Sequence, residues 1–120
     1  MGKGLARACN ILIRECAHVQ KGEEVLVLAD EAQDRDLVLE LAAAVARVGA
    51  RAISMIYPVI APYREPPRSV VLAMKNAPVV LACGTTPMGA EVIKETLESG
   101  ARMLSMFRIS PESFARTVPI

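Results

Sequence analysis

The sequence predicts a single α/β domain over residues 1–120, with a parallel sheet of about four strands, helices on both faces and a flavodoxin-like or Rossmann-like architecture. Three observations indicate this class. Short apolar runs alternate with segments of helical periodicity, a seven-residue pattern occurs twice, and 52% of the residues are hydrophobic while only 3% are aromatic. Because parallel strands need crossover connections, this alternation favours two βαβ units over hairpins.

A helix is predicted first. Apolar residues recur at three- and four-residue spacing between Leu5 and Val19, and a Lys-Gly pair then ends the pattern. Cys9 and Cys16 lie seven residues apart, so both are expected on the same buried face of this helix.

A strand, a helix and a second strand follow. The run 25–29 is apolar at both odd-numbered and even-numbered positions, as in a strand that is buried on both faces, and Asp30 ends it. Asp34 can cap the next helix, and Gly49 can end that helix in the left-handed conformation. The run 51–57 is then predicted as the second strand.

A proline-rich connection, 58–67, is predicted to be an extended surface loop, because proline has no backbone N–H to donate. A short helix over 69–75 and a third strand over 79–83 come next. The following helix is expected to have Thr86 as its cap and Pro87 at its first position.

This last helix is expected to end at Gly100 and to carry four buried side chains: Val92, Ile93, Thr96 and Leu97. A fourth strand is predicted over 103–107. The segment Ser110-Pro111-Glu112 then has the pattern of another helix start.

The chain also resembles itself. The seven residues from Gly49 (Gly-Ala-Arg-Ala-Ile-Ser-Met) and the seven from Gly100 (Gly-Ala-Arg-Met-Leu-Ser-Met) share five residues. Each copy follows a strand and a helix of similar length, which predicts a doubled βαβ unit. Right-handed crossovers then favour the strand order 2-1-3-4.

In a sheet of this order, ligands bind at the carboxyl ends of the first and third strands. The loop 30–34 follows the first strand and the loop Gly84–Gly89 follows the third. The predicted ligand-binding residues in these loops are Asp30, Gly84, Thr85 and Thr86. A glycine, hydroxyl groups and a helix N-terminus suit a small anion. The glycine spacing matches neither Gly-x-Gly-x-x-Gly nor the P-loop, so an ordinary strand-to-helix turn is the competing interpretation.

No catalytic residue, metal ligand or cofactor is predicted for this chain. The only acidic cluster could hold magnesium, but pairing with a helix dipole explains it as readily; it comprises Asp30, Glu31, Asp34 and Asp36. A single histidine, His18, and three cysteines without a Cys-x-x-Cys pair do not supply the usual ligands of zinc.

Charge and hydropathy restrict the expected partners and location. Fourteen basic and thirteen acidic residues leave a net charge of +1. No run of Lys and Arg residues could bind along a phosphate backbone, so no nucleic-acid partner is expected. Charged residues interrupt nearly every apolar stretch well before the ~20 residues of a spanning helix, so no membrane partner is expected. The cysteine usage and the absence of a secretory signal pattern predict a cytoplasmic location.

Four segments occur in an informative order and spacing: Val19 to Val27 with Ala29-Asp30, Gly49-Ala50, Gly100 to Met106, and Ile109 to Glu112. In this arrangement they resemble the N-terminal part of the metallo-aminopeptidase family of the aminopeptidase T type, whose relatives include 2,5-dihydroxypyridine 5,6-dioxygenase. The resemblance covers residues 5–119.

The resemblance implies a non-catalytic N-terminal domain of a longer metalloenzyme, an aminopeptidase or a ring-cleaving dioxygenase relative. Such a domain would form one wall of the cleft for a peptide or small-molecule substrate, and would contact its own C-terminal domain or a second copy in a homodimer. A divalent metal is expected in the C-terminal part, which supplies Glu, His and Asp ligands. The family pattern has a Ser and a His-Thr pair where this chain has Thr85-Thr86-Pro87.

Two alternatives remain open on the sequence. One is a free-standing flavodoxin-like module that binds a small anionic ligand at Gly84 to Gly89. The other is an interaction domain whose first or last helix pairs with another copy through an exposed apolar face. Ligand titration and the oligomeric state, respectively, distinguish them from the enzyme-domain interpretation.

Overall fold

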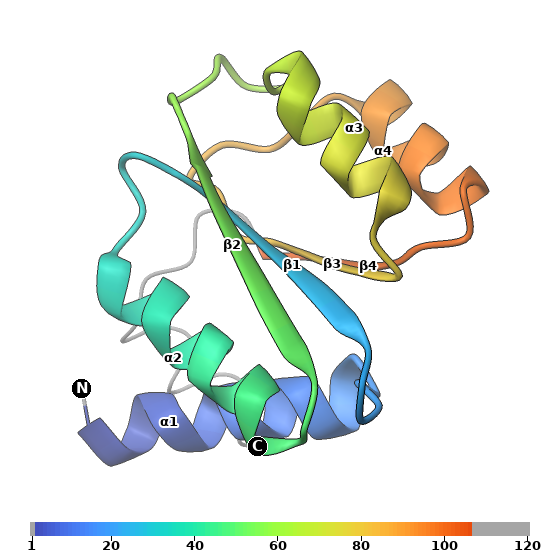
Figure 1. Cartoon of the computed structure of the whole chain (residues 1–120). Coiled ribbons are helices and arrows are strands. Elements are labelled where there is room, and N and C mark those ends of the chain that lie inside the picture. The colour runs from blue at the N-terminus through green and yellow to red at the C-terminus, as the bar shows by residue number, and fades with distance from the viewer. Residues whose placement is uncertain (1, 107–120) are drawn as a thin grey trace.

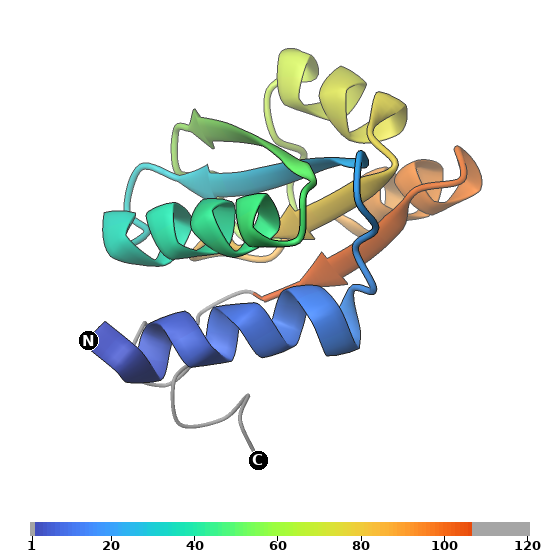
Figure 2. The ribbon, with the colours of Figure 1, turned by 60° about the horizontal axis from the view of Figure 1, so that its bottom comes forward.

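The computed structural model describes residues 2–106, in which a four-stranded, all-parallel sheet lies between two layers of helices (Figures 1 and 2). The strands have the order β2-β1-β3-β4 and are β1 (Glu24–Asp30), β2 (Arg51–Tyr57), β3 (Val79–Ala82) and β4 (Arg102–Ser105). The helices are α1 (Gly2–Ile11), a π-helical turn η1 (Leu12–Cys16), α2 (Arg35–Arg47), α3 (Arg68–Asn76) and α4 (Ala90–Glu98). The predicted fold class and strand order are confirmed.

Both faces of the central strands β1 and β3 are buried, which explains their uninterrupted apolar runs. Odd-numbered residues of these strands pack against α1 and α2, and even-numbered residues pack against α3 and α4. Successive side chains of a strand point to opposite faces, so one apolar run supplies both halves of the core. None of the helices in residues 2–106 is long and apolar enough to cross a membrane.

The two copies of the repeated heptad fold alike. Gly49 and Gly100 have φ values of +81° and +98°, so each ends its helix in the left-handed conformation, which the sequence predicts for Gly49. The alanine that follows each glycine is buried, and a strand begins directly after it. The predicted cap of α2 is also present, since Asp34 Oδ1 accepts a hydrogen bond of 2.8 Å from the Asp36 N–H.

The first helix does not stay α-helical to its end. The Ala17 N–H donates to the Leu12 carbonyl at 2.8 Å, an i→i+5 bond that defines the π-helical turn. This wider turn holds more residues than an α-helical one, so it changes the direction of the side chains that follow. Cys9 is therefore buried while Cys16 is exposed, and the prediction that they share a buried face is wrong.

Helix α4 begins later than predicted. Its N-cap is Gly89, so Thr86 is not the cap and Pro87 is not the first helical residue. The preceding segment runs beside the proline-rich loop, where the Tyr63 N–H donates to the Pro87 carbonyl (2.8 Å) and the Gly89 N–H donates to the Arg64 carbonyl (3.0 Å). These long-range bonds hold the segment extended and delay the helix.

One predicted core position of α4 is wrong as well. Leu97 is 51% exposed, whereas Val92 and Thr96 are buried as expected. The Thr96 hydroxyl donates to the Val92 carbonyl at 2.8 Å, so this polar group is satisfied inside the helix and can face the core. Leu97 then lies on the outer side.

The other predicted bounds agree closely with the structure where it can be compared. Helix α3 includes the predicted range 69–75, and the loop 58–67 is mostly exposed. Strand β4 starts one residue earlier than the predicted 103–107 and ends at Ser105, so Met106 lies outside it. Phe107 and the predicted helix start at 110–112 lie outside the described residues.

Candidate functional site

The carboxyl ends of β1 and β3 lie side by side at the point where the strand order reverses, as the sequence predicts. Asp30 is the last residue of β1, and Thr85 lies just beyond β3. The Asp30 Oδ2 atom accepts hydrogen bonds from the Thr85 N–H (2.6 Å) and the Thr85 hydroxyl (2.7 Å). The Asp30 Oδ1 atom accepts a third bond from the Ala32 N–H at 3.0 Å. We call the two bonds between Asp30 and Thr85 the Asp30–Thr85 clamp.

The clamp explains how a carboxyl group can be buried here. Asp30 has no exposed surface, and burying a carboxylate costs several kcal/mol unless hydrogen bonds replace its water. The Thr85 and Ala32 donors provide that replacement. As a result, the loops after β1 and β3 are joined into one rigid edge.

A second bond joins the same two loops. The Gln33 side chain is buried, and its Nε2 donates to the Cys83 carbonyl at 2.6 Å while its Oε1 accepts from the Asp34 N–H at 2.8 Å. Burial raises the pKa of the Cys83 thiol to about 12, and that thiol donates to the Leu28 carbonyl at 3.0 Å. Cys83 is thus a neutral core thiol rather than a nucleophile.

Tyr57, at the carboxyl end of β2, belongs to the site although the sequence interpretation did not include it. Its side chain is only 2% exposed, and among the described residues its hydroxyl oxygen has no hydrogen-bond partner. A Cβ atom placed on Gly84 would lie 2.7 Å from Tyr57 Oη and 3.2 Å from Asp30 Oδ2. Glycine is therefore needed at position 84, because these two side chains occupy the space.

Burial raises the pKa of Tyr57 to about 12, and the nearby Asp30 carboxylate adds to the effect. The hydroxyl, which is neutral near pH 7 even at the ordinary tyrosine pKa of 10, therefore keeps its proton for donation at higher pH as well. A signal for this residue exists in the sequence, because Tyr57 ends the second strand. Parallel strands end at one edge, and the β1–β2 register does pair Asp30 with Tyr57.

Thr86 turns to a different partner from the other three predicted residues. Its hydroxyl donates to the Ile60 carbonyl at 2.9 Å and so attaches the proline-rich loop to this edge. Asp30, Gly84 and Thr85 lie together, but the N–H and the hydroxyl of Thr85 both already donate to the Asp30 carboxylate. An anion bound at Thr85 would have to displace that carboxylate and would face its negative charge.

The acidic cluster does not converge. Asp30 is held in the clamp, Asp34 caps α2, and Glu31 and Asp36 are exposed. Within residues 2–106 no three His, Cys, Asp or Glu side chains are grouped so that they could hold a metal ion. The described residues therefore offer no such group for a divalent metal, which the family resemblance places in the C-terminal part.

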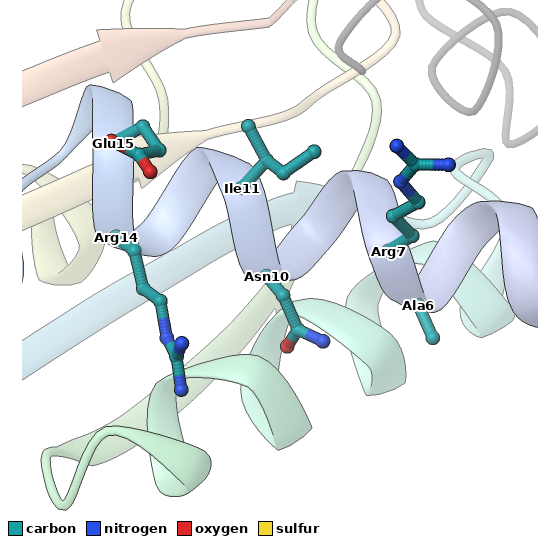
Figure 3. A pocket seen from close by; sticks show the side chains of 6 residues that line it. All are labelled: Ala6, Arg7, Asn10, Ile11, Arg14 and Glu15. Atoms are coloured by element: carbon teal, nitrogen blue, oxygen red, sulfur yellow. The ribbon is translucent and has the colours of Figure 1, made fainter.

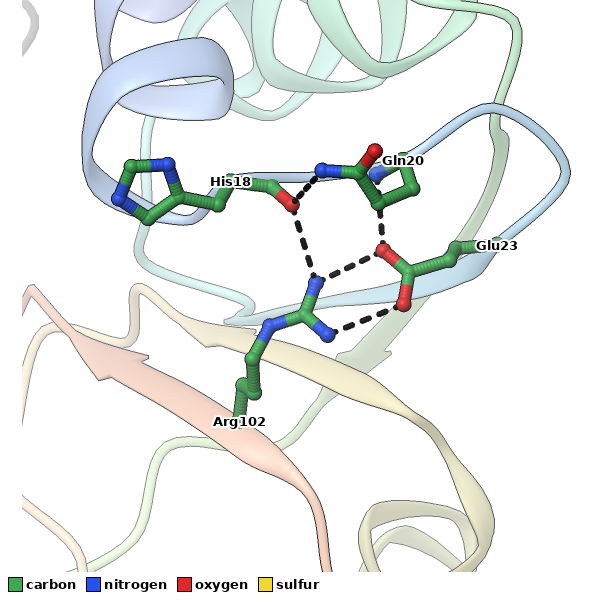
Figure 4. Close-up of polar contacts among 4 residues, drawn as sticks. All are labelled: His18, Gln20, Glu23 and Arg102. Carbon is green, nitrogen blue, oxygen red and sulfur yellow. Dashed lines mark hydrogen bonds and ion pairs between the residues drawn. The ribbon is translucent and has the colours of Figure 1, made fainter.

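A separate polar cluster lies at the amino ends of the strands, where Arg102 begins β4 and Glu23 precedes β1 (Figure 4). Their side chains form a two-bond ion pair of 2.7 and 3.0 Å, and Arg102 also donates to the His18 carbonyl at 3.3 Å. The Arg102 hydrogen bonds hold the pKa of the Glu23 carboxyl below its ordinary value of 4.5. The His18 imidazole points away from the pair in Figure 4, so this cluster is a structural contact.

A hollow on the outer side of α1 lies apart from the loops that follow β1 and β3, which we call the carboxyl edge (Figure 3). It is lined by six residues of the first helix: Ala6, Arg7, Asn10, Ile11, Arg14 and Glu15. One of these is fixed to the neighbouring helix, because Asn10 Oδ1 accepts a bond of 2.8 Å from Arg47 of α2. No residue of the loops after β1 and β3 contributes to this lining.

Comparison with known proteins gives a consistent result. Residues 5–120 match the family model described as NicX: 2,5-dihydroxypyridine 5,6-dioxygenase. The structure is similar to 2,5-dihydroxypyridine dioxygenase from Pseudomonas putida KT2440, with a TM-score of 0.78 and 19% identity over 97% of this chain and 37% of that chain. It is also similar to wild-type AmpT from Thermus thermophilus, with a TM-score of 0.62 and 17% identity over 97% of this chain and 41% of that chain.

The chain thus spans about two fifths of the length of these two proteins. At such identities the likeness shows a shared fold. Comparison of the sequence with curated proteins gave no significant match.

Proposed function

Because the chain belongs to the 2,5-dihydroxypyridine 5,6-dioxygenase (NicX) family, we propose that it is the non-catalytic N-terminal domain of a metalloenzyme related to ring-cleaving dioxygenases and aminopeptidases. Its carboxyl edge forms one wall of the substrate cleft, and its outer surfaces contact the rest of the enzyme or a second copy. The substrate is a small aromatic molecule or a peptide.

The observation that supports this proposal most directly is the Asp30–Thr85 clamp at the strand-order reversal. Open parallel sheets bind ligands at this point, and a binding wall works best when its own hydrogen bonds fix its shape before the ligand arrives. The clamp and the Gln33 bond provide that rigidity. The carboxyl edge therefore suits the passive side of a cleft.

The metal of such an enzyme would lie outside this chain. The described residues offer no group of three suitable ligands, and the most buried carboxylate, Asp30, is already committed to Thr85. We infer that the metal ligands belong to the C-terminal part of the enzyme, and that this chain alone turns over no substrate.

Nuclear magnetic resonance tests the cleft wall in the 120-residue chain. The ¹⁵N-labelled chain is titrated separately with 2,5-dihydroxypyridine, with a leucyl dipeptide and with inorganic phosphate. We expect one of the two organic probes to shift the amide signals of residues 31–34 and 84–89 with an affinity of about 1 mM, because a single wall buries only part of a ligand. The probe that acts identifies the substrate class.

Four results would contradict the proposal. Shifts confined to the hollow on α1, or no shifts at all, would remove the cleft wall. Saturable binding of phosphate at residues 84–89 would favour the anion-binding module instead. Stoichiometric binding of Fe²⁺ or Zn²⁺ by the chain in equilibrium dialysis would contradict the assignment of the metal to another part of the enzyme.

A further inference from the structure

Strand β2 has one open edge. It pairs with β1 through seven residue pairs, from Glu24 with Arg51 to Asp30 with Tyr57. Within residues 2–106 no strand pairs with its other side. The backbone N–H and C=O groups on an open edge can pair with a strand of another molecule.

This edge lacks the features that normally prevent such pairing. Residues 52–57 contain no charge, no proline and no glycine, and the pairing with β1 continues without a bulge. Charged residues, prolines and bulges are the usual means by which natural edges resist association. An unprotected edge of this length is therefore expected to be covered in the working protein.

Apolar side chains surround the open edge on both faces of the sheet. Ile53 is 46% exposed on the side of α3, and Ile56 is 39% exposed on the side of α2. On the α2 side, Leu39 is 66% exposed and lies with Ile56 in a shallow hollow between α2 and β2. Three of the seven large apolar side chains exposed in residues 2–106 thus lie along this one edge.

We propose that the open edge of β2 pairs with the β2 strand of a second copy, antiparallel and about a two-fold axis through Ser54. This register is self-complementary. It places Ile53 of each copy opposite Met55 of the other, and Ala52 opposite Ile56. Opposed residues of an antiparallel pair point to the same face, so Ala52, Ile53, Met55 and Ile56 each meet an apolar side chain, while Arg51 comes opposite Tyr57.

Charge also favours a second copy as the occupant. Exposed Arg51 marks the amino end of β2, and exposed Glu31 lies beside its carboxyl end, where the Glu31 N–H donates to the Tyr57 carbonyl at 2.9 Å. Antiparallel pairing brings Arg51 of each copy to the strand end that Glu31 follows in the other, while Glu24 accompanies that arginine in the β1–β2 register of each copy. The inference names a contact surface for the domain proposed above, but it depends on β2 and not on the Asp30–Thr85 clamp.

Sedimentation velocity of the 120-residue chain tests the proposal between about 1 and about 200 μM. We expect a concentration-dependent species of twice the monomer mass. Ile53→Lys should weaken dimerisation at least tenfold, because it places two charges at the pairing edge. Leu97→Lys, at a similarly exposed leucine on α4, is the matched control and should leave dimerisation unchanged. A wild-type chain that stays monomeric, or a control that dissociates as readily as Ile53→Lys, would overturn the proposal.

Cysteine cross-linking tests the register independently. In a background in which exposed Cys16 is replaced by serine, Ser54→Cys places two thiols opposite each other at the axis, within the spacing of a disulfide. Mild oxidation should then yield a covalent dimer on a non-reducing gel. Ser105→Cys, in the other edge strand β4, should not. Equal cross-linking of the two variants, or none of Ser54→Cys, would overturn the register, while the substrate titrations above would be unaffected.

Discussion

Gly84 is restricted to glycine by its neighbours and not by its backbone torsion. Its missing side chain leaves room for Tyr57 Oη and Asp30 Oδ2. We expect Gly84→Ala to lower the free energy of unfolding by about 1–3 kcal/mol, because the added methyl must displace a fully buried tyrosine. Urea denaturation of the wild-type chain and the variant measures this change.

The matched experiment removes the hydroxyl group that the methyl would meet. Tyr57→Phe should be close to neutral or slightly stabilising, since this oxygen has no partner among the described residues. In the Tyr57→Phe background, Gly84→Ala should cost less than it does alone. Equal costs in the two backgrounds would contradict the close contact.

The Glu23–Arg102 ion pair predicts a small pH dependence. The folded-state pKa of Glu23 lies below the ordinary value of 4.5, so the contribution of the pair is fully present above pH 4.5. As the pH falls below 4.5, the unfolded chain takes up the proton first and the contribution is lost. Both side chains are partly exposed, so we expect only about 0.2–1 kcal/mol.

Urea denaturation at pH 6 and at pH 3.5 checks this effect in the wild-type chain and in Glu23→Gln. The variant should lose less stability than the wild type between the two conditions, because it lacks the titrating carboxyl. An identical loss in both proteins would show that the pair does not contribute.

The sequence placed three of the four residues that meet at this site close together for a definite reason. Asp30, Gly84 and Thr85 follow the first and third strands, and the strand order places those two ends together. Tyr57 lies outside this prediction because it ends β2, which is not one of the two strands at the order reversal. Its burial and its closeness to Gly84 depend on how β2 packs, which no local pattern encodes.

At the scale of elements, the Asp30–Thr85 clamp should stabilise the attachment of β3 to β1. Thr85→Val keeps the N–H bond but removes the hydroxyl bond to a buried carboxyl group. We expect a loss of about 1.5–3 kcal/mol in the free energy of unfolding, as is typical of bonds to charged groups. Chemical denaturation provides the measurement.

Thr86→Val is the matched control for that variant. The Thr86 hydroxyl bonds to a neutral loop carbonyl, so its loss should cost only about 0.5–1.5 kcal/mol. A larger loss in Thr86→Val than in Thr85→Val would mean that the proline-rich loop, and not the clamp, holds this edge together.

The start of α4 and the end of the first helix differ from the predictions for physical reasons. The start of α4 depends on bonds from Tyr63 and Arg64, more than twenty residues earlier in the chain, whereas capping signals are local. The π-helical turn that exposes Cys16 places an extra residue in one turn, and the apolar spacing before it is that of an ordinary α-helix. Long-range bonds thus decide the start of α4, and a local i→i+5 bond accounts for the end of the first helix.

For the molecule as a whole, the sheet separates two apolar cores that should contribute independently. Val45 of α2 and Val92 of α4 are completely buried on opposite faces. Each change to alanine should lower the free energy of unfolding by about 1–3 kcal/mol. The double variant should lose the sum to within about 0.5 kcal/mol, and a marked departure from additivity in urea titrations would show that the cores are coupled.

The whole-molecule prediction succeeded because several signals agreed. Doubly buried strands, left-handed glycines after α2 and α4, and the handedness of crossovers all favour one topology. The repeated heptad added the correct grouping of β1 with β2 and of β3 with β4. The sequence pattern could not predict the exposure of edge residues such as Ile53 and Ile56. Apolar residues in an edge strand follow the same pattern as residues of the core.

The internal repeat has a geometric consequence. Half a turn about a line between β1 and β3 exchanges β1 with β3, β2 with β4, and α2 on one face with α4 on the other. The repeat relates Ala52 to Met103 on the opposite face, and the strand pairings then make Asp30 the symmetry mate of Thr85. The two mates bond to each other across the pseudo-dyad. Two acids in these places would repel each other, so the carboxyl ends of β1 and β3 are where the internal symmetry of the domain must break.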